Sequence, residues 1–145
     1  MINTKNIRII SIGKVKKTWI KDGIKSYLRR LPGISIKEIK DSNSSKESET
    51  IISSIMSNES LVVLGEEFKT YSSIEFANKL DSISSNKYVF IIGGPDGLPD
   101  EIKNRSSWKL SLSPLTFPHE LAQLLLLEQI YRANTILQGH QYHRK

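Results

Sequence analysis

The last seven residues of the chain, G-H-Q-Y-H-R-K, bring together side chains that move protons, stack on bases and bind phosphates. His140, Tyr142, His143, Arg144 and Lys145 all lie here, and the segment holds two of the three histidines in the sequence. Chain ends are ordinarily poor in such groups. Imidazole is the side chain best suited to acid–base work near neutral pH, and arginine suits phosphates. We therefore expect this tail to be functional.

Two internal stretches combine glycine or proline with polar groups. Glycines 93, 94 and 97 directly follow the buried-type run Y-V-F-I-I. Glycine lets a ligand approach the backbone closely, so this is either a binding loop or a plain tight turn. Residues 110–120, L-S-L-S-P-L-T-F-P-H-E, hold two prolines that keep the backbone rigid. Such a loop suits hydrogen bonding to a flat heterocycle, or it is merely the entry to a helix.

Several standard patterns are missing. The glycine spacing is not G-x-G-x-x-G, no G-K-[ST] follows it, and no G-x-S-x-G is present. These absences argue against dinucleotide, P-loop and nucleophile-elbow chemistry. His140 and His143 are three residues apart, but one other histidine and no cysteine make a poor metal site. We expect no metal.

Short apolar runs alternate with amphipathic stretches along the chain. Strands are predicted over residues 7–12, 34–39, 61–64, 88–92 and 108–112, and helices over 18–31, 72–83 and 118–137. The polar run 41–49 is expected to be a loop that leads into a helix ending near Met56. This alternation predicts an α/β fold, a mostly parallel sheet with helices on both faces. We expect one domain spanning residues 1–145.

Positive charge is concentrated at the N-terminus. Residues 1–30 hold nine Lys/Arg and one acid, Asp22, whereas residues 61–145 hold nine of each sign. A one-sided basic surface is typical of proteins that bind polyanions, although a solvated lysine-rich face is the plainer interpretation. Trp19 and Tyr27 lie within the basic segment and favour nucleic acid, because stacking needs such residues. The sequence has no membrane-spanning run, no signal peptide and no cysteine, so we expect a cytoplasmic protein.

The last predicted helix contains four consecutive leucines, residues 124–127. Consecutive positions point around most of a helix, so this helix must be covered on more than one side. The sheet can cover one side. Either a larger fold or a neighbouring subunit covers the other, and we expect a homodimer through this helix.

Four blocks of the sequence, in order, resemble the RlmH family. They are I-I-G-G-P-D-G-L, W-K-L-S-L-S-P-L-T-F-P-H, L-L-L-L-E-Q-I-Y-R-A and the closing G-H-Q-Y-H-R. Members of that family belong to the SPOUT superfamily and methylate N3 of a pseudouridine in large-subunit (23S) ribosomal RNA. The resemblance implies the same activity here, with the large subunit or the assembled ribosome as substrate. It also implies a C-terminal trefoil knot that binds S-adenosylmethionine, and a homodimer.

The resemblance further assigns residues to roles. It places the cofactor on three loops, formed by Leu64 and Gly65; by Gly93, Gly94 and Gly97; and by Ser113, Pro114, Leu115, Thr116, Phe117 and Pro118. Tyr142 would then contact the target base, and Arg144 with Lys145 the phosphates. His143 and His119 would position the base or help to remove its N3 proton. In such dimers the tail of one subunit reaches the cofactor of the other.

The chain departs from the family pattern at several positions. L-G-E-E-F-K replaces the usual L-D-x-x-G-K, Glu120 and Gln141 replace prolines, and Gln123 and Asn134 replace frequent arginine and tryptophan. Three alternatives stay open, and the departures at Gly65 and Phe68 support only the first of them. They are a non-catalytic RNA- or ribosome-binding protein of this fold, a SPOUT methyltransferase that acts on transfer RNA, and a dimeric α/β protein that binds a small ligand.

Overall fold

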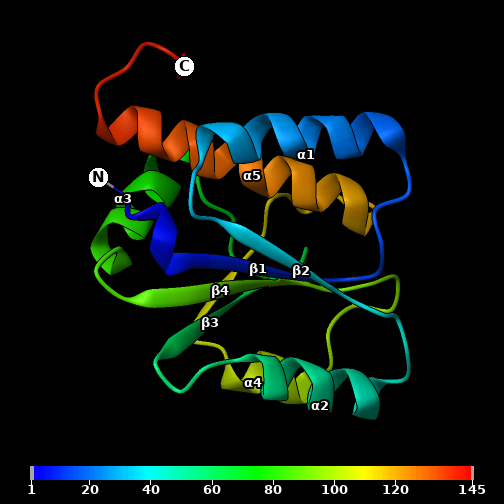
Figure 1. Cartoon of the computed structure of the whole chain (residues 1–145). Coiled ribbons are helices and arrows are strands. Elements are labelled where there is room, and N and C mark those ends of the chain that lie inside the picture. The colour runs from blue at the N-terminus through cyan, green and yellow to red at the C-terminus, as the bar shows by residue number, and fades with distance from the viewer. Residues whose placement is uncertain (1, 145) are drawn as a thin grey trace.

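The computed structural model describes residues 2–144, which form one five-stranded parallel sheet and its helices (Figure 1). The strands are β1 (Ile7–Ile12), β2 (Ser35–Ile39), β3 (Glu59–Leu64), β4 (Lys87–Ile92) and β5 (Trp108–Leu110). The α-helices are α1 (Thr18–Arg30), α2 (Ser44–Ser54), α3 (Ser73–Ile83), α4 (Asp100–Arg105) and α5 (His119–Leu137), and a short 3-10 helix covers Thr4–Asn6. The strand order is β2-β1-β4-β3-β5.

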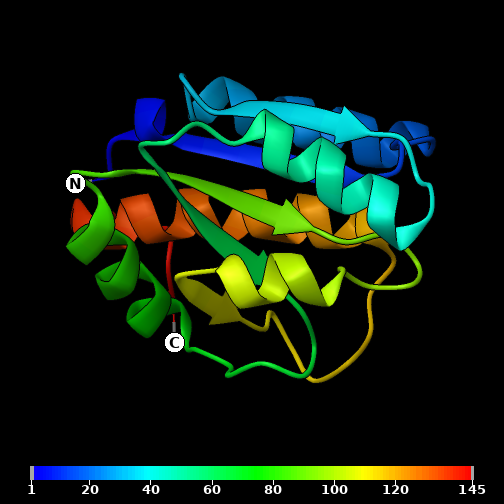
Figure 2. The same cartoon turned by 90° about the horizontal axis from the view of Figure 1, so that it is seen from below.

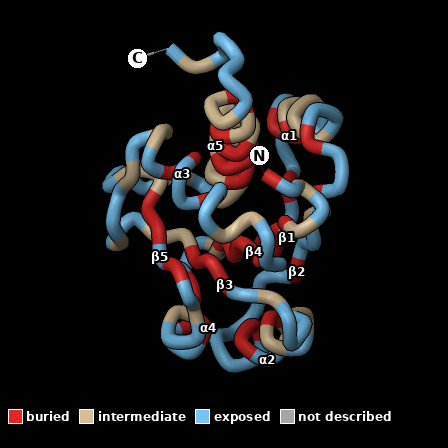
Figure 3. The backbone as a smooth tube through the Cα atoms, turned by 90° about the vertical axis from the view of Figure 1, so that its left-hand side faces the viewer, coloured by how far each residue is buried: buried red, intermediate tan, exposed pale blue. Residues whose placement is uncertain are grey.

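The central strand β4 shows why the sheet is covered on both faces. Its side chains alternate, so that Tyr88 and Phe90 enter one apolar cluster while Val89 and Ile91 enter the other. Figure 3 shows the resulting layers, with α1, α3 and α5 over one face and α2 and α4 over the other. From below, α2 and α4 cross in front of the strands (Figure 2). A continuous apolar run is what a strand buried on both faces requires.

The predicted α/β class with a parallel sheet is confirmed, and most elements lie where the sequence placed them. Local signals were the most informative. Ser72 and Glu75 form a reciprocal capping box at the start of α3, in which each side chain accepts a hydrogen bond from the other residue's backbone N–H. Pro118 directly precedes α5.

Three expectations were wrong in detail. The loop over 41–49 is shorter, because the Asn43 side chain accepts from the Lys46 N–H and starts α2 at Ser44. Strand β5 ends at Leu110 rather than at residue 112. Strand β3 begins at Glu59 rather than at residue 61.

Helix α5 lies between α1 and α3 over the sheet, so its two apolar sides are partly explained within one chain. Leu126 and Leu127 are fully buried, and Leu124 contacts Gly23 of α1. Leu121 and Leu125 are half-buried and belong to neither apolar cluster. The four leucines are therefore weaker evidence for a partner than the sequence alone indicated.

Within residues 2–144, no helix combines the length and the apolar character needed to cross a bilayer.

Candidate active site

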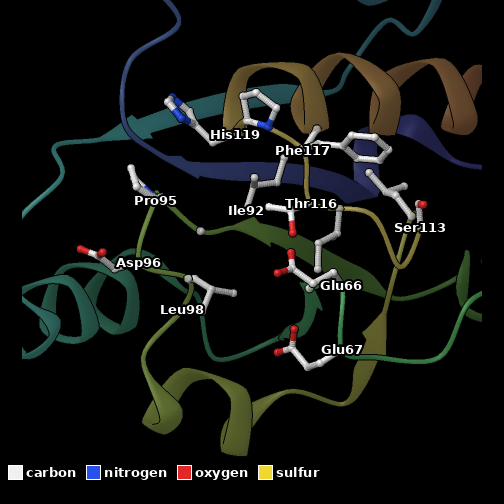
Figure 4. A pocket seen from close by; sticks show the side chains of 18 of the residues that line it. Glu66, Glu67, Ile92, Pro95, Asp96, Leu98, Ser113, Thr116, Phe117 and His119 are labelled. Atoms are coloured by element: carbon white, nitrogen blue, oxygen red, sulfur yellow. The ribbon is translucent and has the colours of Figure 1, made fainter.

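A cavity of about 980 Å³ opens at the carboxyl edge of the sheet (Figure 4). Because all strands are parallel, the loops after β3, β4 and β5 meet at this edge. The predicted cofactor residues that line the cavity are Leu64, Gly65, Gly93, Gly94, Gly97, Ser113, Leu115, Thr116, Phe117 and Pro118. His119 also lines it, whereas Pro114 is not among the lining residues. Thus three loops that are distant in sequence form one site.

The loop after β4 is a tight turn, and glycine is suited to positions 93 and 97 for different reasons. The Gly97 N–H donates to the Gly94 carbonyl at 3.0 Å, which closes a turn with proline at its second position. Gly97 has φ +76°, in the left-handed region that favours glycine, and a β-carbon there would have no atom within 4 Å. At Gly93 a β-carbon would approach the Gly97 carbonyl carbon to 2.9 Å. Gly93 is therefore needed by the turn, and Gly97 borders open space.

The loop after β5 is held by its own serines. The Ser111 hydroxyl, fully buried, donates to the Ser113 carbonyl at 2.8 Å and accepts from the Ser113 N–H at 3.1 Å. The Ser113 hydroxyl accepts from the Leu115 N–H. These bonds fix the backbone and leave Thr116 pointing into the cavity toward Glu66 (Figure 4).

The loop after β3 keeps a closed turn despite its unusual sequence. The Phe68 N–H donates to the Gly65 carbonyl at 3.3 Å, and the half-buried Phe68 ring packs against the apolar cluster under α2 and α4. Lys103 forms an ion pair with Glu67 at 3.2 Å. Phe68 is not a lining residue, so the departure at Phe68 changes the support of the loop, whereas the departure at Gly65 lies in the cavity wall.

His119 lies at the rim of the cavity and faces the loop after β1. A β-carbon on Gly13, which has φ +99°, would approach the His119 Nε2 to 2.9 Å. That nitrogen is buried and has no hydrogen-bond partner among the described residues. In Figure 4 the imidazole ring is turned away from Thr116 and Glu66. The ring therefore packs on Gly13 rather than projecting into the cavity.

Glu120, one of the departures from the family pattern, ties the same loop to α5. Its carboxylate accepts hydrogen bonds from the backbone N–H groups of Lys16 and Lys17, the latter at 3.1 Å. These bonds lower the pKa of Glu120 below its ordinary value. Two other departures, Gln123 and Asn134, each carry a buried side-chain oxygen with no partner among the described residues.

The C-terminal tail packs on its own α5, away from the cavity of the same chain. The Tyr142 hydroxyl donates to Glu128 at 3.2 Å, and its ring lies edge-on to Tyr131 at 4.8 Å between centroids. Glu128 is nine residues beyond His119 along the helix, or about 13 Å. None of Tyr142, His143 and Arg144 lines the cavity, and Lys145 lies outside the described residues.

Arg132 holds the tail in this position. Its guanidinium bonds to Glu128 at 2.7 Å, lies 4.8 Å from the Tyr142 ring centroid and approaches the His143 Nδ1 to 3.1 Å. Arginine can only donate, so Nδ1 of His143 accepts and the ring proton lies on Nε2. Partial burial is the main cause that raises the pKa of Tyr142, and the Tyr27 hydroxyl and Glu128 raise it further. Tyr142 is therefore a neutral hydrogen-bonding group at physiological pH.

Sequence reasoning missed part of the cavity wall. The additional lining residues are Glu66, Glu67, Ile92, Pro95, Asp96, Leu98, Lys103, Leu112 and Ala122. The carboxylates of Glu66, Glu67 and Asp96 outnumber the single cation Lys103, so the site favours a ligand that carries positive charge. The missed acids share one signal, because each lies within four residues of the end of a buried strand, β3 for Glu66 and Glu67 and β4 for Asp96. Among residues 2–144, no group of three or more His, Asp or Glu could hold a metal ion.

A family model described as "Predicted SPOUT methyltransferase" matches residues 5–143. The chain belongs to this family of methyltransferases. It is 51% identical over 144 residues, 99% of both chains, to the "Ribosomal RNA large subunit methyltransferase H" of Prochlorococcus marinus (strain MIT 9211). It is 50% identical over 143 residues, again 99% of both chains, to the protein of that name in Parasynechococcus marenigrum (strain WH8102). These full-length matches confirm the resemblance to the RlmH family.

Solved structures agree on the fold. A probable methylase family protein from Haemophilus influenzae Rd KW20 matches with a TM-score of 0.62 at 16% identity, over 99% of this chain and 72% of that one. The SpoU methyltransferase AviRb from Streptomyces viridochromogenes, solved in complex with AdoMet, matches with a TM-score of 0.50 at 11% identity, over 88% of this chain and 57% of that one. At these identities the likeness concerns the fold alone.

Proposed function

We propose that this chain, acting as one domain over residues 1–145, transfers a methyl group from S-adenosylmethionine to N3 of a pseudouridine in large-subunit ribosomal RNA. The carrying observation is the convergence of the loops after β3, β4 and β5 on one cavity of about 980 Å³. That volume is at the upper end of small-molecule sites, roughly 300–1,000 Å³. The names of the full-length relatives support the RNA substrate.

The cavity fits the cofactor in size and in charge. When bound, S-adenosylmethionine supplies an activated methyl group on a positively charged sulfur. Acidic residues outnumber Lys103 in the lining, which suits a ligand with a cationic sulfur and an ammonium group. Hydrogen bonds from the N–H groups of Ser113 and Leu115 fix the loop Ser113–Pro118, which would offer its remaining peptide groups to the adenine, and the open space at Gly97 lets the ligand approach the turn. The proposal includes a knot in the C-terminal part of the chain, as in the SPOUT superfamily.

The tail supplies the groups that meet the RNA. Tyr142 contacts the target base, and Arg144 with Lys145 binds the flanking phosphates. The hydrogen bond from Arg132 leaves His143 with an Nε2–H donor, which suits a base carbonyl better than it suits removal of the N3 proton. His119 packs on Gly13 and serves to shape the rim. Catalysis here consists mainly of alignment and exclusion of water.

The active site is completed by a second copy of the chain. Within one chain the tail lies along the middle of α5, and it does not line its own cavity. The half-buried Leu121 and Leu125, outside both apolar clusters, offer the outward face of α5 to a partner. A two-fold dimer through this helix places the tail of each protomer at the cavity of the other. The proposed location is the cytoplasm, with ribosomes as the substrate.

The first test measures binding of S-adenosylmethionine to the purified protein by calorimetry. It then measures methyl transfer to four candidate substrates. These are ribosomes, free large subunits, deproteinised large-subunit RNA and bulk transfer RNA, all from cells that lack the modification. Binding with labelling of ribosomal RNA supports the proposal. Binding without label on any RNA favours the non-catalytic alternative, and label on transfer RNA alone favours the transfer-RNA enzyme.

A further inference from the structure

Helix α1 carries a row of four cations at intervals of four residues. Lys17, Lys21, Lys25 and Arg29 are all exposed, and Lys17 is the residue that precedes the first turn. Residues four apart lie on the same side of a helix and about 6 Å apart along its axis. The row therefore runs the length of the helix, while Ile20 and Ile24 on the other side are buried in the core.

This row is unfavourable for the folded chain by itself. Like charges at i and i+4 destabilise a helix, and cations near its N-terminus oppose the helix dipole. Asp22 is the only acid in the helix. None of the four cations forms an ion pair with any described residue, although four such pairs exist elsewhere in residues 2–144. An external anion would remove the repulsion.

The row begins beside the cavity. The Glu120 carboxylate accepts from the Lys17 N–H, and its neighbour His119 lines the cavity and packs on Gly13. The backbone of Lys17, the first residue of the row, is thus fixed next to the rim, and the other three residues lead away from it along α1. A strand that places one base in the cavity would pass its neighbouring phosphates over this row.

We propose that Lys17, Lys21, Lys25 and Arg29 form a track for the RNA backbone that flanks the target nucleotide. The track extends the proposed function and rests on it. Positive side chains on a rigid helix neutralise successive phosphates and release counterions, which positions the substrate without reading its sequence. The apolar residues Ile20 and Ile24 of α1 are buried in the core, and the exposed Trp19 is a single side chain rather than an apolar face with which to enter a membrane.

The decisive variant is Lys21→Gln/Lys25→Gln, with Lys40→Gln/Lys46→Gln as a matched control. All four lysines are exposed; Lys46 lies in α2, on the opposite face of the sheet from α1, and Lys40 lies in the loop between β2 and α2. Binding to ribosomal RNA is measured between 50 and about 250 mM salt. Each phosphate contact contributes about 0.7–0.9 to the slope of log K against log salt. We expect the slope of the Lys21/Lys25 variant to fall by about 1.5 and its KM for ribosomes to rise about tenfold or more, whereas kcat and S-adenosylmethionine affinity change less than twofold.

The control variant is expected to behave like the native protein. The melting temperature of the Lys21/Lys25 variant should equal or exceed the native value, because repulsion within the helix is relieved. An unchanged salt slope and KM would overturn the track while leaving the methyltransferase assignment intact. Conversely, RNA binding that depends on Lys21 and Lys25 in a protein that methylates no RNA would sustain the track and refute the proposed function. The RNA track would also be overturned if the Lys21/Lys25 variant lost binding to anionic vesicles while its RNA binding was unaffected.

Discussion

The hydroxyl of Tyr142 donates a hydrogen bond to the carboxylate of Glu128, 3.2 Å away in the middle of α5. The tail of the chain therefore turns back along its own helix, and its chemistry-bearing residues do not reach the cavity of the same protomer. In the proposed arrangement the cavity and the tail of one chain belong to two different active sites. A symmetric dimer through α5 would bring the tail of one copy to the cavity of the other, and this proposal can be tested in several ways.

Deletion of residues 142–145 should abolish methylation and leave the dimer and cofactor binding intact. The deletion removes the proposed base and phosphate contacts, whereas Leu121, Leu125 and the cavity are unchanged. Activity, molar mass by light scattering and cofactor affinity by calorimetry are measured on the same preparation. Full activity in a truncated dimer would refute the role of the tail.

Mixed dimers test whether the site is shared between copies. Thr116→Trp fills the cavity from a loop position that points into it, and it should be as inactive as the tail deletion. Random exchange of the two inactive proteins gives half heterodimers with one intact site each, so activity should return to about a quarter of the native level. Mixtures that stay inactive, despite proven subunit exchange, would show that each tail serves its own chain.

Gly97→Ala and Gly139→Ala form a matched pair. Both glycines have positive φ, +76° and +73°, and neither would place a β-carbon within 4 Å of another atom. Both substitutions should therefore cost about 1 kcal/mol of backbone strain. Only Gly97 borders the cavity, so only Gly97→Ala should weaken S-adenosylmethionine binding, by about tenfold. Equal affinities in calorimetry would remove the turn after β4 from the cofactor site.

Glu59 and Arg8 provide a stability prediction independent of function. Two hydrogen bonds of 2.7 Å join them, and the Glu59 side chain is 3% exposed. The Arg8 hydrogen bond lowers the pKa of Glu59, so the stabilisation is present above the unfolded pKa and is lost as the pH falls through the folded one. Glu59→Gln should lower the free energy of unfolding by about 3 kcal/mol at pH 7. Urea unfolding should show this gap shrinking below about pH 4, where the unfolded glutamate is protonated; a pH-independent gap would contradict the assignment.

The sequence predicted those elements that are specified locally. The Ser72–Glu75 capping box and the apolar run of β4 carry their signals within a few residues. Helix α4 was not predicted, because it has six residues, of which only Ile102 is buried, and so it shows no periodic pattern of apolar residues. The start of α2 was hidden in a polar run, where a single asparagine cap decides the boundary.

The candidate site, like the fold, has features that local sequence predicts and features that it does not. Glycine and proline at strand ends indicated the three loops, because parallel strands bring their carboxyl ends to one edge. The return of Tyr142 onto Glu128 and the packing of His119 on Gly13 could not be predicted, since each joins residues far apart in sequence. The role of Glu120 also depends on such a contact, with Lys16 and Lys17.

The most direct measurement uses ribosomes from a strain that lacks the modification, mixed with the purified protein and methyl-labelled S-adenosylmethionine. The large-subunit RNA is then digested and mapped by mass spectrometry. We expect one new methyl group, on N3 of a single pseudouridine, and none with the protein truncated before Tyr142. Bound cofactor without any label on ribosomal RNA, or label at another type of base, would contradict the proposed function.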